Sequence, residues 1–259
     1  MSFIKFIGTA GARFVVTKQL RSSGGVWMSV GETNLYIDPG PGALVRCLNS
    51  KPKLDPSTLE GILLTHKHLD HSGDVNVMIE AMTEGGFKKR GVLFAPEDAL
   101  EEDPVVLRYL RNYVEKMIVL KENTEYRIGE VSFSTAQKHR HRAETYGINF
   151  KIKPRSVSLI SDTKFFPELC DLYRGEILII HAVRLKPVVD EPIEHLSVED
   201  VKTILKKTKP KLTILTHFGM TMIRAKPWEV ALELEKELGL KVIAASDGMK
   251  FDLERDVEK

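Results

Sequence analysis

Three histidines and one aspartate stand close together in the segment 65–71, which reads THKHLDH. The chain has eight histidines, so three of them are concentrated directly after an apolar run at 62–64. Neutral imidazoles and carboxylates are good ligands for zinc and neighbouring first-row metals. Four such donors exceed what one open catalytic ion takes from so short a segment. We therefore predict a site for two metal ions that includes His66, His68, Asp70 and His71.

Three further candidate ligands each follow a β-like run. His141 ends the segment VSFSTAQKHRH, Asp162 ends VSLISD and His217 ends LTILTH. Because strands deliver side chains to fixed places, we expect these three residues to meet the first motif. Each could singly be a cap, a turn residue or a buried histidine with its own partners. Together with the first motif they make seven potential ligands.

Short apolar runs bounded by glycine, proline or polar residues predict the strands of the fold. We expect strands at Phe3–Ile7, Gly25–Ser29, Asn34–Ile37, Ile62–Thr65, Val92–Ala95, Val131–Ser134, Ile148–Ile152, Val157–Ser161, Ile177–Ile180, Leu212–Thr216 and Lys241–Ala244.

Helical periodicity predicts four helices between these strands. They are expected at 74–84, at 103–117 (DPVVLRYLRNYVEKM), from Ser197 onward with Asp200 close to a capping box, and from Pro227 to about Gly239. The mixture predicts an α/β or α+β architecture in which helices cover sheets.

Composition excludes some classes of protein. The 259 residues, 42% of them hydrophobic, suffice for one large domain or two small ones. The sequence contains no run of about 18 apolar residues, so no membrane span is predicted. We see no leader pattern and therefore expect a cytoplasmic protein. A net charge of +2 does not by itself imply nucleic-acid binding. Cys47 and Cys170 lie far apart and are expected to be buried thiols.

The sequence resembles the metallo-β-lactamase-fold hydrolases over nearly its whole length. The segment 65–71 matches the family signature HxHxDH, and the later His, Asp and His follow in the family's order. The opening segments FIGTAGARF, RSSGG and NLYIDPGPG, with Asp38 ending a strand, also look like the first strands of that superfamily. The resemblance implies one hydrolase domain over residues 1–259, folded as a four-layer αββα sandwich with two metal ions at one edge.

The resemblance also implies how the ligands are shared between the ions. His66, His68 and His141 would hold one ion, Asp70, His71 and His217 would hold the other, and Asp162 would bridge them. His141 is preferred to His139 because a glycine follows it six residues later, as in the family. His139 is expected to be a neighbour of the site.

Within the family, the sequence is most similar to the phosphodiesterases. β-Lactamases usually have Cys at the position of Asp162, and flavodiiron proteins have a carboxylate at the position of His68. His195, 22 residues before His217, stands where tRNA 3′-processing endonucleases and the cyclic phosphodiesterases of phosphonate breakdown have a catalytic histidine. The 21 residues from His141 to Asp162 leave no room for the flexible arm of the tRNA enzymes.

Two features depart from these relatives. The chain lacks the clustered cysteines that give the cyclic phosphodiesterases an extra structural zinc. His181 follows the run EILII, where the processing enzymes have a glutamate that pairs with the catalytic histidine, so that relay is in doubt.

The expected activity is hydrolysis of a phosphodiester by a hydroxide that bridges two divalent ions, with zinc expected and manganese as the alternative. Asp70 would orient the nucleophile as well as bind metal, and His195 would protonate the leaving oxygen. The expected substrate is a small phosphodiester, with RNA as the second option. The sequence does not decide whether the protein forms a homodimer. It also does not decide whether Arg140, Arg142 and Arg184 contact the phosphate. The alternatives are hydrolysis of a thioester, lactone or lactam, and a non-catalytic metal-binding carrier on the same fold.

Overall fold

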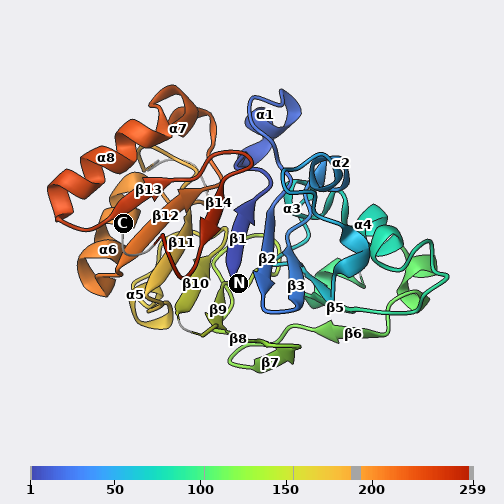
Figure 1. The fold of residues 1–259 in the computed structure, drawn as a ribbon. Helices are drawn as coiled ribbons and strands as arrows, with labels where there is room; N and C mark the ends of the chain where they lie inside the picture. Colours follow the sequence, from blue (N-terminus) through green and yellow to red (C-terminus); the bar gives the residue numbers. More distant parts are fainter. Residues whose placement is uncertain (1, 102, 154, 188–193, 257–259) are drawn as a thin grey trace.

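The computed structural model describes residues 2–101, 103–153, 155–187 and 194–256, and these contain two seven-stranded sheets (Figure 1). The first sheet has the order β14-β1-β2-β3-β4-β5-β6, with β14 (Lys250–Asp252), β1 (Phe3–Phe6), β2 (Val26–Val30), β3 (Thr33–Ile37), β4 (Gly61–Leu63), β5 (Val92–Ala95) and β6 (Lys116–Val119). Its strands are antiparallel from β14 to β3 and parallel from β3 to β6.

The second sheet repeats this plan. Its order is β13-β12-β11-β10-β9-β8-β7, with β13 (Val242–Ala244), β12 (Leu212–Thr216), β11 (Ile177–His181), β10 (Ser156–Ile160), β9 (Ile148–Lys151), β8 (Val131–Thr135) and β7 (Glu125–Ile128). The strands β10 to β13 are parallel, so their carboxyl ends meet at one edge of the sheet. That edge receives Asp162, His181 and His217.

The helices cover the outer faces of the two sheets (Figure 1). Those preceding β11 are α1 (Ala12–Thr17), α2 (Ala43–Leu48), α3 (Leu69–Ser72), α4 (Val75–Met82) and α5 (Leu169–Leu172), with 3-10 turns η1 (Pro56–Thr58), η2 (Glu97–Ala99) and η3 (Arg108–Asn112). Those following it are α6 (Val198–Thr208), α7 (Met220–Arg224) and α8 (Pro227–Leu238). In the described part of the chain, no helix has the length and apolar character needed to cross a membrane.

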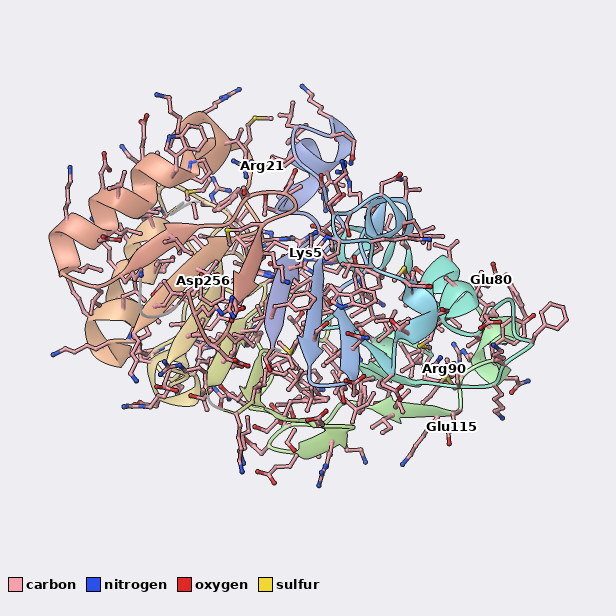
Figure 2. The ribbon with its side chains drawn as sticks, viewed as in Figure 1. Lys5, Arg21, Glu80, Arg90, Glu115 and Asp256 are labelled. Carbon is pink, nitrogen blue, oxygen red and sulfur yellow. The ribbon has the colours of Figure 1, made fainter. Side chains whose placement is uncertain are left out.

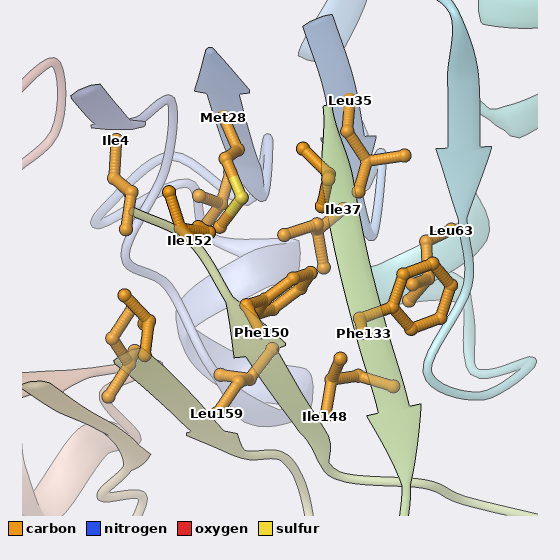
Figure 3. Close-up of a cluster of buried hydrophobic side chains, with 14 of the residues drawn as sticks. Ile4, Met28, Leu35, Ile37, Leu63, Phe133, Ile148, Phe150, Ile152 and Leu159 are labelled. Carbon is orange, nitrogen blue, oxygen red and sulfur yellow. The ribbon is translucent and has the colours of Figure 1, made fainter. Parts of the chain in front are cut away.

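Alternation along the strands divides the apolar side chains among three clusters. Met28, Ile37 and Leu63 point between the sheets, where they meet Phe133 and Phe150 of the second sheet (Figure 3). Their neighbours on the other face, Trp27, Tyr36 and Ile62, pack with α2 and α4. On the second sheet, Leu178 and Ile180 likewise face α5, α6 and α8. The order is helix, sheet, sheet, helix, which confirms the predicted four-layer sandwich.

Local signals placed the longer helices. Ser197 accepts a hydrogen bond from the Asp200 amide, and the Asp200 carboxylate accepts one from the Ser197 amide, so the capping box of α6 is complete. Pro227 opens α8, and Gly239 ends it in the left-handed conformation with φ 64°. All eleven predicted strands are observed, although β6, β7 and β14 were not predicted.

The helix predicted at 103–117 is wrong. The segment contains the 3-10 turn η3 and no α-helix among its described residues, and its last two residues, Lys116 and Met117, begin β6 and pair with β5. The Asn76 side chain donates to the Val105 carbonyl and accepts from the Leu107 amide, so tertiary hydrogen bonds replace those of a helix. The apolar spacing reflected burial of Val106 and Leu110 in the core, not helical geometry.

Candidate metal centre

The first motif leaves β4 and enters the short helix α3, which turns its polar side chains toward the carboxyl edge of both sheets. Asp38, at the end of β3, accepts hydrogen bonds from the amide and the hydroxyl of Thr65, each at 2.7 Å. The same carboxylate accepts a 2.9 Å hydrogen bond from Nδ1 of His71. These bonds hold the start and the end of the motif to one buried group, and they leave Nε2 of His71 pointing away from Asp38.

One cluster contains His66, His68 and His141. Nδ1 of His68 lies 3.1 Å from Nε2 of His66 and 3.1 Å from Nε2 of His141. Ligands held 2.0–2.2 Å from a tetrahedral zinc ion lie roughly 3.3–3.6 Å apart, so three nitrogens this close fit the coordination of one ion. His141 is oriented by its other nitrogen, Nδ1, which lies 3.2 Å from the Glu194 carbonyl.

A second cluster contains Asp70, His71, Asp162 and His217. Nε2 of His217 lies 3.2 Å from Nε2 of His71, 3.4 Å from Oδ2 of Asp70 and 3.5 Å from Oδ1 of Asp162. Nε2 of His71 lies 3.6 Å from Oδ2 of Asp162. The structure therefore gathers the seven residues into two neighbouring donor clusters. That they bind metal, and that Asp162 bridges the two ions, stay predictions.

The charges of the second cluster shift the pKa values of His217 and Asp162 in opposite directions. Burial opposes a charge on His217, but the Asp162 carboxylate outweighs it and raises the pKa of His217 to about 9. Burial would also raise the pKa of Asp162, yet the charges on His217 and His195 keep it well below its usual range. A divalent cation must displace these imidazole protons, so its affinity should increase with pH.

Contacts from Arg21 and Thr9 stabilise the loop that carries His217. Arg21, labelled in Figure 2, donates to the Thr9 hydroxyl and the Ala245 carbonyl, and its guanidinium lies 5.4 Å from the ring centre of Phe218. His217 itself has φ 60°, a left-handed conformation that neighbouring contacts must maintain. One of them is the hydrogen bond from the Phe218 amide to the Thr9 carbonyl.

His139 is a neighbour of the clusters with its ring turned elsewhere. Its Nδ1 lies 3.2 Å from the backbone carbonyl of Asp162, and its Nε2 lies 2.8 Å from the Tyr173 hydroxyl. Burial lowers the pKa of His139 to about 3, so the ring is neutral. Gly147 makes room for this pair, because a Cβ there would lie 2.7 Å from Nε2 of His139. His139 thus positions the backbone that carries Asp162.

His195 lies at the open side of the clusters. Its Nδ1 is 3.4 Å from Oδ2 of Asp162, and its ring centre is 5.4 Å from that of His141. The side chain is 21% exposed, against 2% for Asp162. Its ring can therefore touch both the clusters and an incoming molecule.

The arginines differ in their surroundings. Arg140 is largely exposed, with its guanidinium 4.9 Å from the ring centre of Phe166 and 3.9 Å from Glu168. Arg142 is exposed. The Nε of Arg184 is buried and has no hydrogen-bond partner among the residues that the structure describes, and the Arg184 backbone is bridged to Ser197. Phosphate contacts from these three side chains stay predictions.

Two residues of the site were not placed by sequence reasoning. Asp38 was noted only as the end of a strand, and its support of His71 depends on a contact 33 residues along the chain. The role of His181 was left open, and its side chain lies against the second cluster, with Nδ1 2.9 Å from Oδ1 of Asp162. The signal for both was an ionisable residue at the carboxyl end of a buried strand.

A family model for the β-lactamase superfamily domain matches residues 33–218. The chain belongs to the β-lactamase superfamily. It is also 31% identical over 260 residues to the uncharacterized protein MJ1374 of Methanocaldococcus jannaschii, a match that covers 96% of this chain and 94% of that protein. The family and the two clusters agree with a metal-dependent hydrolase that binds divalent cations.

Solved structures show the same fold at low identity. The metallo-β-lactamase fold protein YhfI of Bacillus subtilis has a TM-score of 0.78 at 16% identity, covering 96% of this chain and 98% of that one. A diphosphatase of the PhnP family has a TM-score of 0.73 at 20% identity, covering 98% of both chains. The short form of human tRNase Z has a TM-score of 0.70 at 16% identity, covering 97% and 99%. The predicted membership of the metallo-β-lactamase fold is confirmed.

Proposed function

We propose that this protein is a single hydrolase domain that cleaves phosphodiesters with two bound divalent ions. The observation that carries the proposal is the position of His195. An imidazole that is partly exposed and 3.4 Å from Asp162 supports the proposal that His195 gives a proton to a leaving oxygen. Hydrolysis of a thioester, lactone or lactam by the same clusters would not need this group.

We propose the following metal-binding and catalytic roles for the residues of the two clusters and for His195. His66, His68 and His141 would hold one ion, Asp70, His71 and His217 the other, and Asp162 would lie between them. The bound ions would supply a nucleophile at neutral pH by lowering the pKa of a coordinated water to about 7. Asp70 would orient that nucleophile, and His195 would protonate the oxygen that departs. Zinc is the proposed ion because imidazole nitrogens outnumber carboxylates.

The likeness to a PhnP-family diphosphatase and to tRNase Z supports a phosphate-containing substrate. We propose a small phosphodiester. The segment from His141 to Asp162 is too short to contain the flexible arm expected of a tRNA-processing enzyme. RNA is therefore the second option.

The test is a comparison of substrate classes with one metal-loaded preparation. Bis-p-nitrophenyl phosphate should be hydrolysed, and chelation should abolish turnover. The His195→Ala variant should retain its metal ions and lose activity toward phosphodiesters with poor leaving groups. Hydrolysis of thioester or lactam substrates without phosphodiester turnover would contradict the proposal. A metal-loaded protein inactive on all three classes would instead indicate a carrier.

A further inference from the structure

Three neighbouring strands deliver one donor each to the same edge. In the second sheet β10, β11 and β12 run parallel, and His181 is the last residue of β11, paired with Thr216 of β12. Asp162 follows β10 by two residues and His217 follows β12 by one. Because the parallel pairing of the three strands fixes this alignment, His181 lies between Asp162 and His217.

The contacts of His181 are those of a member of the second cluster. Its Nδ1 lies 2.9 Å from Oδ1 of Asp162, and its ring stacks on that of His217 with centres 4.4 Å apart and planes 19° apart. Its ring centre is 5.6 Å from that of His71. One donor atom from each of these four residues lies within 4.8 Å of the other three. Tetrahedral ligands held at 2.0–2.2 Å lie roughly 3.3–3.6 Å apart, so a bound ion would draw these four donors closer together.

We propose that His181 is a ligand of the second metal ion. The assignment gives each cluster three imidazoles: His66, His68 and His141 in one, and His71, His181 and His217 in the other. This assignment rests on the proposed function only in requiring bound metal ions. It does not depend on the substrate.

A third imidazole would strengthen the preference of the second site for zinc over manganese. Imidazole suits zinc, copper, iron and nickel, whereas carboxylate, carbonyl and water ligands suit magnesium, calcium and manganese. Without His181 the second site would offer two imidazoles and the carboxylates of Asp70 and Asp162, a set that accepts manganese. With His181 we expect it to bind Zn²⁺ at least about 100-fold more tightly than Mn²⁺.

A direct test counts the coordinated imidazoles. In protein loaded with two Co²⁺ ions, each coordinated histidine with a remaining N–H gives one exchangeable, paramagnetically shifted proton resonance. We expect six such resonances from the six histidines of the two clusters. Five in the wild-type protein would overturn the proposal, and this readout needs no variant and no substrate.

Binding by variants tests the same point independently. In His181→Asn the amide N–H can still donate to Asp162, but the strong nitrogen ligand is lost. We expect the affinity for the second Zn²⁺ to fall about 100-fold or more while the first ion binds normally, as measured by titration of metal-free protein. Asp55→Asn is the control, because that exposed carboxylate caps the turn η1 and belongs to neither cluster.

Unchanged binding of both ions by His181→Asn would show that the hydrogen bond to Asp162 suffices, and would overturn the proposal. The outcomes also separate it from the proposed activity. Six imidazole resonances without phosphodiester turnover would leave the ligand assignment standing and remove the proposed function.

Discussion

Nδ1 of His71 donates a 2.9 Å hydrogen bond to Oδ2 of Asp38, and both side chains are buried. Because Nδ1 carries the proton, Nε2 is left free to face His217 and the second cluster. Asp38 is held in turn by the amide and hydroxyl of Thr65. A carboxylate that orients a metal-binding histidine in this way controls affinity without touching the ion.

Asp38→Asn should therefore weaken binding of the second ion about 10–100-fold. The amide would place N–H groups against donors that now meet a carboxylate oxygen. Titration of metal-free protein with Zn²⁺ measures the effect. Asp55→Asn is the control, since Asp55 is an exposed carboxylate that only caps the turn η1. Equal affinities for Asp38→Asn and wild type would exclude the orienting role.

Asp162→Ala should disturb both ions and abolish essentially all turnover, if this carboxylate bridges them. In the structure Asp162 contacts His71, His181, His195 and His217, so its loss leaves four imidazoles without their shared anion. Metal content measured by mass spectrometry of the native protein is the readout. Retention of two ions per chain would refute the bridging assignment.

His195→Ala should lower kcat while the metal content stays unchanged. If His195 protonates the leaving oxygen, the defect should be large for a substrate with an alkoxide leaving group. It should shrink for nitrophenolate, which barely needs a proton. Comparing kcat for the two kinds of ester gives the answer. A defect of equal size on both would argue against a general acid.

Gly147→Ala should destabilise the fold by about 1–3 kcal/mol, because its Cβ would collide with the Tyr173 hydroxyl and crowd His139. Urea denaturation measures the free energy of unfolding. In the double variant with Tyr173→Phe the nearest atom is removed, so the two effects should be less than additive. Strict additivity would show that the hydroxyl does not cause the strain.

Cys47 should react slowly with alkylating reagents in the folded protein. Burial raises the pKa of its thiol to about 11, so the reactive thiolate is a minor species at pH 8. An unfolded chain ionises this thiol from about pH 8.5, so the stability that the neutral form contributes is lost as pH increases toward 11. Iodoacetamide labelling at pH 8, with and without urea, checks the prediction. Rapid labelling of Cys47 without urea would contradict it.

The sequence alone predicted the strands and the positions of the candidate site residues for a local reason. Apolar runs identify buried strands, and polar residues at their carboxyl ends mark the edge where a site can form. Ser197 with Asp200, and Pro227 with Gly239, likewise carry their helix signals within a few residues. Such signals do not depend on the rest of the fold.

Only the tertiary structure decided which donors share a cluster. His139 and His181 are both histidines beside strands, yet His139 turns to Tyr173 while His181 faces Asp162 and His217. The segment 103–117 is held by Asn76 and β5 instead of forming a helix. In each case the partner is distant in the sequence, and the pairing of strands and the packing of layers determine where a side chain points.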